Sequence, residues 1–396
     1  IRIARRRSDG SLETVAGGFS RLNNDIAVYE GRIYVSHLGK ISILEDGRAR
    51  DLVTGLPSRG LHQNNAIAFG PDGRLYFGQG TVSNSGVVDS YALDHLRRAG
   101  ALGDHDVPGA DVVLVGRNYG VTDLIGTGET RTTGAFSPWG TATRPGQRIA
   151  SASPGQAASG AIMSLTADGL DLRVYAWGFR NPFGLAFGPD GRLYTTNNGA
   201  NRVPPRAVSG DPDTLWRVEE GAWHGWPDFY VGHPITDPAF KPPDAPRGEF
   251  LIANHEELLK GRRRPPDPVV PLGLHVAPAK FDFCRDGRFG FEGQAFVPEF
   301  GSLLTPLEGL VPSLVEGRQV VRVDVEQGTV HTFAANRRPG PTGQGERGGL
   351  ERPVDARFGP DGDLYVVALG IVEWRGNNWL SPPASGVIWR IRHEGR

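Results

Sequence analysis

Two polar residues of the chain occupy the same position relative to a repeated motif, and both have side chains suited to catalysis. His62 lies seven positions before Phe69, and Arg180 lies seven positions before Phe187. Histidine titrates closest to neutral pH, so His62 is the natural proton acceptor of the pair. Arginine is suited to hold an anion or to stabilise negative charge that develops during a reaction.

Other polar residues fall at or next to the same position in further copies of the motif. Asn181 follows Arg180, Arg352 lies six positions before Phe358, and Arg21 lies seven positions before Val28. A single residue of this kind could equally form hydrogen bonds with the backbone of a tight link. The position that these residues share is what favours a functional site. The sequence therefore predicts a polar ring made of His62, Arg180, Asn181 and Arg352, with Arg21 as a further candidate.

An oxygen-rich loop follows the second strong copy of the motif. Residues 197–201 read NNGAN, and Asp211 and Asp213 come shortly after. Carbonyl and carboxylate oxygens are the ligands that calcium prefers, although an ordinary surface loop has the same composition. The chain has no helix-loop-helix calcium spacing, zinc pattern, phosphate loop, GxGxxG or GxSxG motif.

The repeated motif itself predicts β-hairpins. Residues 69–76 and 187–194 both read FGPDGRLY, and residues 358–365 read FGPDGDLY. Proline presets the turn, aspartate bonds its own backbone, glycine takes the positive φ, and the flanking apolar residues alternate. Weaker copies occur at residues 26–35 and 281–296.

A second pattern, strand then acidic-glycine turn then strand, follows each hairpin, for example in ISILEDGRARDLV from Ile41. Tandem four-stranded units indicate an all-β fold, a β-propeller. Residues 1–19 show only this second half, which we interpret as the outer part of an incomplete first blade. Five full units and one half predict six blades in a single domain over residues 1–396.

Two insertions interrupt the repeat, at residues 84–159 and 231–274. We expect a short helix at residues 91–102 and a short strand at 112–115 in the first insertion, and a helical turn at 255–259 in the second. Long excursions of repeat proteins often lie on the binding face, so both insertions are predicted to cover the site on the top face.

Composition excludes several classes of function. The 396 residues contain 56 glycines and 31 prolines, which implies many tight turns. A net charge of −1 gives no field that favours nucleic acid. The single cysteine, Cys284, allows no intramolecular disulfide, and no apolar run is long enough for a membrane span. Because the chain begins with Ile1, we expect a processed or truncated start.

Several stretches together resemble the glucose/sorbosone dehydrogenase family of soluble quinoproteins. They are GLHQNNAIAFGPDGRLYFGQG, GFRNPFGLAFGPDGRLY, GAWHGWPD, LERPVDARFGPDG and SGVIWRI. The resemblance implies a six-bladed propeller that holds pyrroloquinoline quinone (PQQ) and calcium on its top face. It also implies oxidation of aldoses, sugar aldehydes or related alcohols, an external electron acceptor, and a periplasmic or secreted location.

The resemblance assigns roles to individual residues. His62 would be the catalytic base. Arg180 and Asn181 would contact the quinone oxygens, and Arg352 would contact a cofactor carboxylate. Gln79 would lie near the cofactor. Gly199 and Ala200 would offer backbone carbonyls to the calcium ion.

The chain also departs from the family. Leu61 stands where glucose-oxidising members have an acidic residue before the base, so His62 must be oriented differently. Val354 replaces the second arginine of an RxRD pattern, and the cofactor-contacting lysine has no counterpart near residues 298–301, which predicts weaker cofactor binding. The alternatives to a dehydrogenase are a calcium-dependent propeller hydrolase of lactonase type and a non-catalytic propeller that binds a sugar or a partner.

Overall fold

The computed structural model describes residues 2–7, 9, 11–17, 19, 23–302, 317–337, 349–375, 378–382 and 385–393. The chain divides into two compact units. The first comprises Ile1–Pro182, Val203–Ala207 and Glu219–Pro266, and the second comprises Phe183–Arg202, Val208–Val218 and Asp267–Arg396. Whether the whole chain acts as one domain remains a prediction.

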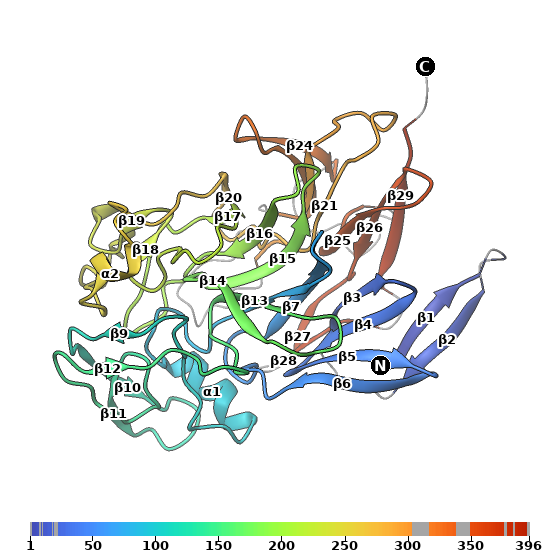
Figure 1. The fold of residues 1–396 in the computed structure, drawn as a ribbon. Coiled ribbons are helices and arrows are strands. Elements are labelled where there is room, and N and C mark those ends of the chain that lie inside the picture. Colours follow the sequence, from blue (N-terminus) through green and yellow to red (C-terminus); the bar gives the residue numbers. More distant parts are fainter. Residues whose placement is uncertain are drawn as a thin grey trace. The chain divides into compact units, whose positions relative to one another are not determined.

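The first unit contains two four-stranded antiparallel sheets (Figure 1). The first sheet has the order β3 (Asn23–Tyr29), β4 (Arg32–His37), β5 (Lys40–Glu45), β6 (Arg48–Thr54). The second has the order β14 (Arg173–Trp177), β13 (Ala161–Leu165), β8 (Leu75–Gln79), β7 (Asn64–Phe69). The hairpin β1 (Arg2–Arg6) and β2 (Leu12–Gly17) forms a separate two-stranded sheet.

The second unit contains three larger sheets. One has the order β15 (Asn181–Phe187), β16 (Leu193–Asn198), β17 (Asp213–Arg217), β20 (Val270–Gly273). The next runs β21 (Asp282–Phe283), β22 (Ala295–Glu299), β23 (Gln319–Asp324), β24 (Thr329–Ala335). The last joins β25 (Pro353–Phe358), β26 (Leu364–Ala368) and β29 (Val387–Ile391), and β27 (Glu373–Arg375) pairs only with β28 (Asn378–Leu380).

The three strong motifs form hairpins with one shared turn chemistry, as predicted. The hydroxyl of Tyr76 donates to Asp72, that of Tyr194 to Asp190, and that of Tyr365 to Asp361, at 2.8 to 2.9 Å. The same aspartates accept the backbone N–H two residues further on. The glycine after each aspartate has a φ of 75 to 80°, which a side chain would strain. Local sequence is therefore sufficient to define these turns.

The fold is an all-β propeller, but the prediction of six blades is wrong. The described residues form five blade-like sheets of three or four strands. The predicted half-blade, β1 and β2, pairs only with itself in an antiparallel register from Arg2–Gly17 to Arg6–Leu12. Because β1 and β2 form their backbone hydrogen bonds with each other, neither adds a strand to one of the larger sheets. The half unit therefore does not complete a blade.

The insertions form small elements in the first unit. The first insertion holds α1 (Ser90–Arg98), β9 (Val112–Val113), β10 (Asn118–Thr122), β11 (Thr130–Gly134) and β12 (Arg148–Ile149). After β18 (Phe229–Tyr230), the second holds β19 (His233–Pro234), η1 (Pro238–Phe240) and α2 (His255–Leu259). An antiparallel bridge between Leu114 and Ile252 connects the two insertions.

One strand assignment needs correction. Residues 215–223, LWRVEEGAW, have the strand and acidic-glycine turn of the second repeated pattern, which predicts that a further strand follows the turn directly. Instead the chain first makes the second insertion, and β20, within the predicted insertion 231–274, pairs with β17. Among the described residues, no helix has the length and apolar character needed to cross a bilayer.

Candidate active site

His62 lies in the link that leads into β7, the position predicted for the polar ring. Its Nδ1 atom is 3.0 Å from the carbonyl oxygen of Thr81 and 3.1 Å from the Thr81 hydroxyl oxygen. A carbonyl only accepts hydrogen bonds, so Nδ1 carries the proton and donates it. The lone pair of the ring therefore belongs to Nε2, which is the arrangement that a general base requires.

The electrostatic surroundings of His62 keep it neutral. Burial is the main cause that holds the pKa of His62 well below its usual range, and the positive charge of Arg180 lowers this pKa further. The hydrogen bond to Thr81 opposes the shift. A neutral imidazole at physiological pH is ready to accept a proton.

Arg180 is a buried cation in the link before β15, with 5% of its surface exposed. Its Nε donates to the side-chain oxygen of Asn84 at 3.1 Å, and its carbonyl accepts the N–H of Thr81 at 3.0 Å. Asn84 is itself held by Asp89, which accepts the Asn84 N–H at 3.0 Å and caps the start of α1. The first insertion thus holds Arg180 in place through Asn84 and Asp89.

Asn181, the first residue of β15, is held by a residue that the sequence analysis did not single out. The side-chain nitrogen of Asn65 donates to Asn181 Oδ1 at 2.8 Å and to the Pro182 carbonyl at 3.1 Å. The register of β7 and β8 shifts between Asn64 and Ile67, and this bulge includes Asn65. The bond from Asn65 therefore fixes the orientation of the Asn181 side chain.

Gln79 ends β8 and is fully buried. Its side-chain nitrogen donates to the carbonyls of Pro57 at 2.9 Å and Gly80 at 3.2 Å. Its side-chain oxygen has no hydrogen-bond partner within the described part of the chain. A buried acceptor without a partner is costly, so a ligand N–H or O–H at this point would be stabilising.

Glycines allow these groups to approach one another closely. A Cβ atom on Gly80 would lie 2.3 Å from the Cβ of His62 and 2.9 Å from Asn181 Oδ1. A Cβ on Gly78 would lie 2.1 Å from the carbonyl oxygen of Pro182. The GQG sequence at residues 78–80 is therefore required sterically by the packing of the site.

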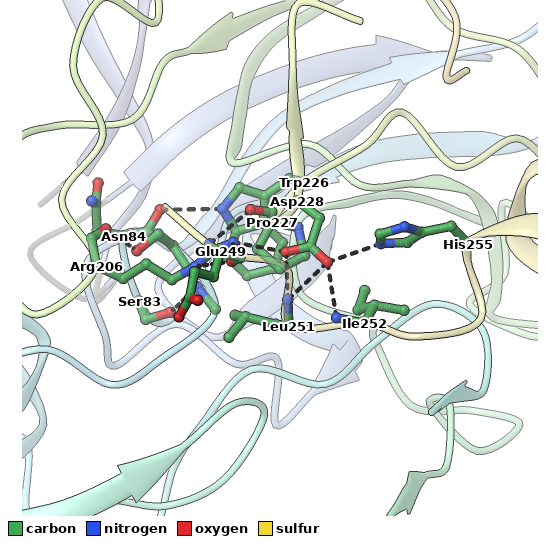
Figure 2. Close-up of polar contacts among 12 residues, drawn as sticks. Ser83, Asn84, Arg206, Trp226, Pro227, Asp228, Glu249, Leu251, Ile252 and His255 are labelled. Carbon is green, nitrogen blue, oxygen red and sulfur yellow. Dashed lines mark hydrogen bonds and ion pairs between the residues drawn. The ribbon is translucent and has the colours of Figure 1, made fainter. Parts of the chain in front are cut away.

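A buried ion pair organises the GWPD stretch at residues 225–228. Figure 2 shows the guanidinium of Arg206 against Asp228, 2.7 Å away, with both side chains almost fully buried. Asp228 also accepts the N–H groups of Leu251 and Ile252 and contacts His255 Nε2 at 3.0 Å. The indole of Trp226 donates to the Asn84 carbonyl at 3.1 Å, which links this network to the residue that holds Arg180.

The oxygen-rich loop lies in the second unit and has a defined geometry. Asp213 accepts the Gly199 N–H and the Ala277 N–H, both at 2.7 Å, and Asp211 accepts the Ala200 N–H at 2.6 Å. These buried carboxylates shape the loop through its N–H groups. No hydrogen bond among the described residues uses the Gly199 or Ala200 carbonyl oxygens, so the loop retains oxygens suited to a hard cation.

Among the described residues, no three His, Cys, Asp or Glu side chains lie together in an arrangement that could hold a metal ion. Glu299 is buried, and burial raises its pKa to about 7, with the Asp213 charge as a further cause. One of its oxygens accepts from Gln319 Nε2 at 2.7 Å. A cation in this unit would therefore depend strongly on backbone oxygens.

Arg352 lies just before β25, as its position in the repeat predicts. Its Nη1 donates to the carbonyls of Gly301 at 2.9 Å and Ser302 at 2.8 Å, and its guanidinium lies over the Phe300 ring at 4.9 Å. Burial and the Arg318 charge lower its pKa to about 10, so it stays charged at neutral pH. Its Nε has no hydrogen-bond partner among the described residues.

The structure brings His62, Gln79, Arg180 and Asn181 together in the first unit, whereas Gly199, Ala200 and Arg352 belong to the second. Arg21 lies outside the described residues. The supporting residues Thr81, Asn84 and Asn65 were missed. Thr81 acts mainly through its backbone, so no sequence motif indicates it. The two adjacent asparagines at residues 64–65 lie close to His62 in the sequence and are the signal that could have indicated Asn65.

The sequence model of the family described as Glucose / Sorbosone dehydrogenase matches residues 136–246, which confirms the resemblance over a stretch that includes Arg180, Asn181, Gly199 and Ala200. No curated protein matches the chain.

Among solved structures, a glucose dehydrogenase is 14% identical, with a TM-score of 0.55 over 99% of this chain and 91% of that one. The apo form of the soluble aldose sugar dehydrogenase of Escherichia coli is 15% identical, with a TM-score of 0.53 over 99% and 90%. The holo PQQ domain of pyranose dehydrogenase from Coprinopsis cinerea is 15% identical, with a TM-score of 0.53 over 99% and 92%. At these identities the likeness concerns the fold.

Proposed function

We propose that the protein is a PQQ- and calcium-dependent oxidoreductase that oxidises a sugar or sugar aldehyde. The observation that carries this proposal is the state of His62, a neutral imidazole whose Nδ1–H is bound by Thr81 and which lies close enough to Arg180 for the guanidinium to lower its pKa. The family match and the titles of the structural neighbours, which name sugar dehydrogenases and a PQQ domain, support the same reading.

In this proposal His62 Nε2 accepts the proton of the substrate hydroxyl at the carbon that is oxidised. Bound PQQ supplies the two-electron acceptor for the hydride that leaves this carbon. Arg180 and Asn181 would contact the cofactor oxygens and stabilise negative charge there, and Asn84 and Asn65 hold the two side chains in position. The unpartnered oxygen of buried Gln79 fits a ligand donor.

For calcium, the carbonyl oxygens of Gly199 and Ala200 are the candidate ligands. Bound calcium would polarise the cofactor as a Lewis acid. Asp211 and Asp213 would keep these carbonyls in position by binding the N–H groups of the same loop. Arg352 would pair a cofactor carboxylate through its guanidinium, which the carbonyls of Gly301 and Ser302 hold in position and whose Nε lies 4.0 Å from Glu351 Oε1.

The finer features of the function are part of the proposal. The substrate is an aldose or a sorbosone-like aldehyde, an external acceptor reoxidises the cofactor, and the protein works in the periplasm or after secretion. We infer that Leu61 and Val354 make both the orientation of the base and the binding of the cofactor differ from those of glucose-oxidising members of the family.

A reconstitution experiment tests the proposal directly. Purified protein is mixed with PQQ and calcium, and the quinone absorbance band is followed while aldoses or sorbosone are added. Bleaching of the band together with dye reduction is expected. Absence of PQQ binding by calorimetry would contradict the proposal, and hydrolysis of lactones without added quinone would favour the lactonase-type alternative. Sugar binding without turnover would favour a non-catalytic propeller.

A further inference from the structure

We propose that Asp106, in the first insertion, is a positioning residue for His62. The inference rests on the proposed role of His62 as a base. It concerns a carboxylate 44 positions further along the chain, which acts through the backbone of residues 81–83.

Asp106 holds this backbone segment through both of its carboxylate oxygens. Its Oδ1 accepts the N–H of Val82 at 2.6 Å, and its Oδ2 accepts the N–H of Ser83 at 3.1 Å. The Ser83 hydroxyl donates a further hydrogen bond to Oδ2. Three donors from two successive residues converge on one carboxylate, so the direction of this segment is closely defined.

The same segment contacts His62 through Thr81. Thr81, directly before Val82, supplies both oxygens that face His62 Nδ1. The Thr81 hydroxyl donates to the Ser83 carbonyl at 2.6 Å, so its lone pair is turned toward the imidazole. The N–H groups of Leu61 and His62 donate to the carbonyls of Val82 and Thr81 at 3.0 and 3.1 Å. Residues 81–83 thus fix both the backbone and the ring of His62.

Asp106 is itself held in place through its neighbour Val107. The neighbouring Val107 N–H donates to the Ser159 hydroxyl at 3.1 Å, and the Ser159 N–H donates to the Val107 carbonyl at 2.8 Å. Ser159 stands two residues before β13, an inner strand of the same sheet as β7 and β8. Asp106 is therefore attached to the sheet that carries His62, and not to a free loop.

The surroundings of the buried Asp106 carboxylate shift its pKa. Asp106 is 2% exposed, and burial raises its pKa to about 6, while the bonds from Ser83 and Val82 oppose the shift. A buried carboxylate is costly unless it is fully hydrogen-bonded. Only a side chain with two acceptor oxygens satisfies both adjacent N–H groups together with the hydroxyl, which explains an aspartate here.

The decisive measurement is the tautomer of His62 in Asp106→Asn. Protein labelled with ¹⁵N-histidine is studied by long-range ¹H–¹⁵N correlation without cofactor, with His62→Gln used to assign the signals. The parent should show a protonated Nδ1, and the variant should shift toward the Nε2–H form that an unconstrained imidazole prefers. This readout needs no PQQ, so it is distinct from a failure of the proposed function.

A matched control exists in the same insertion. Asp123 is also 2% exposed and also accepts two adjacent backbone N–H groups and one hydroxyl, from Gly126 and Thr127, and it additionally pairs with Arg97. Asp123→Asn should leave the His62 tautomer unchanged. In reconstituted enzyme, Asp106→Asn should lower kcat by up to about 100-fold with KM nearly unchanged, because the base is displaced, whereas Asp123→Asn should not.

Two results would overturn the inference: a His62 tautomer in Asp106→Asn identical to the parent's, or equal loss of kcat in both aspartate variants. If Asp106→Asn does not fold, the milder Ser83→Ala variant removes only the hydroxyl bond to Asp106. A partial shift of the His62 tautomer in Ser83→Ala supports the inference, and an unchanged tautomer contradicts it.

Discussion

The Nδ1 atom of His62 lies 3.0 Å from the carbonyl oxygen of Thr81. A carbonyl defines the tautomer of the ring as firmly as a carboxylate would, because it too only accepts hydrogen bonds. It carries no full charge, however, so it stabilises a protonated imidazole less than a carboxylate does. This agrees with a pKa of His62 well below the usual range, and it makes Leu61 compatible with a functional base.

Replacement of the base is the first prediction. His62→Gln should reduce kcat by about 100- to 10,000-fold, the range that a positioned general base contributes. PQQ affinity should change by less than threefold, because the contacts proposed for the cofactor come from other residues. Steady-state dye reduction and calorimetric titration with PQQ measure the two effects. A variant with the parent's kcat would remove His62 from the mechanism.

The steric requirement at Gly80 gives the second prediction. Gly80→Ala places a methyl group 2.3 Å from the His62 Cβ, and such overpacking should cost about 1 to 3 kcal/mol of unfolding free energy. It should also displace His62 and lower kcat. Gly103→Ala is the control, because an added Cβ there meets no atom within 4 Å. Urea unfolding of both variants tests the difference, and equal stability would refute the steric reading.

Glu299 predicts a pH dependence of stability. Its pKa is raised from 4.5 to about 7 by burial and by Asp213. Between pH 4.5 and 7 the folded state holds more protons than the unfolded state. The contribution of Glu299 to the free energy of unfolding is therefore fully present below about pH 4.5 and is lost as the pH rises through 7. The loss approaches about 3 kcal/mol, since one pKa unit corresponds to about 1.4 kcal/mol.

The Glu299→Gln variant should abolish this loss. It should exceed the parent in stability at pH 8 by up to about 3 kcal/mol and match it near pH 5. The side chain of glutamine can still accept the hydrogen bond from Gln319. Urea denaturation in the presence of a chelator, at pH 5, 6, 7 and 8, provides the comparison. Parallel pH curves for the two proteins would show that Glu299 does not titrate in this range.

Calcium binding provides the last prediction. Calcium at 100 times its dissociation constant should stabilise the folded protein by about 2.7 kcal/mol, and the shift in Tm should follow the calcium concentration. Asp213→Ala should abolish this shift, because Asp213 orients the loop through the N–H groups of Gly199 and Ala277. Asp324→Ala is the control, since Asp324 also accepts two backbone N–H groups, at the turn after β23. Equal calcium shifts in both variants would exclude the loop as the binding site.

The sequence by itself determined the hairpins and the place of the polar residues in the links. The Pro-Asp-Gly turns depend on neighbours within five positions, as the Asp72–Tyr76 bond shows, and His62, Arg180 and Arg352 follow from the repeat. Tertiary structure alone decided the number of blades, since the choice of partner for β1 and β2 is not local. It also decided the state of His62, because Thr81 and Asp106 reach the base through contacts between residues 19 and more positions apart. Hydrogen bonds of this kind depend on which segments the fold brings together, and no spacing along the chain encodes them.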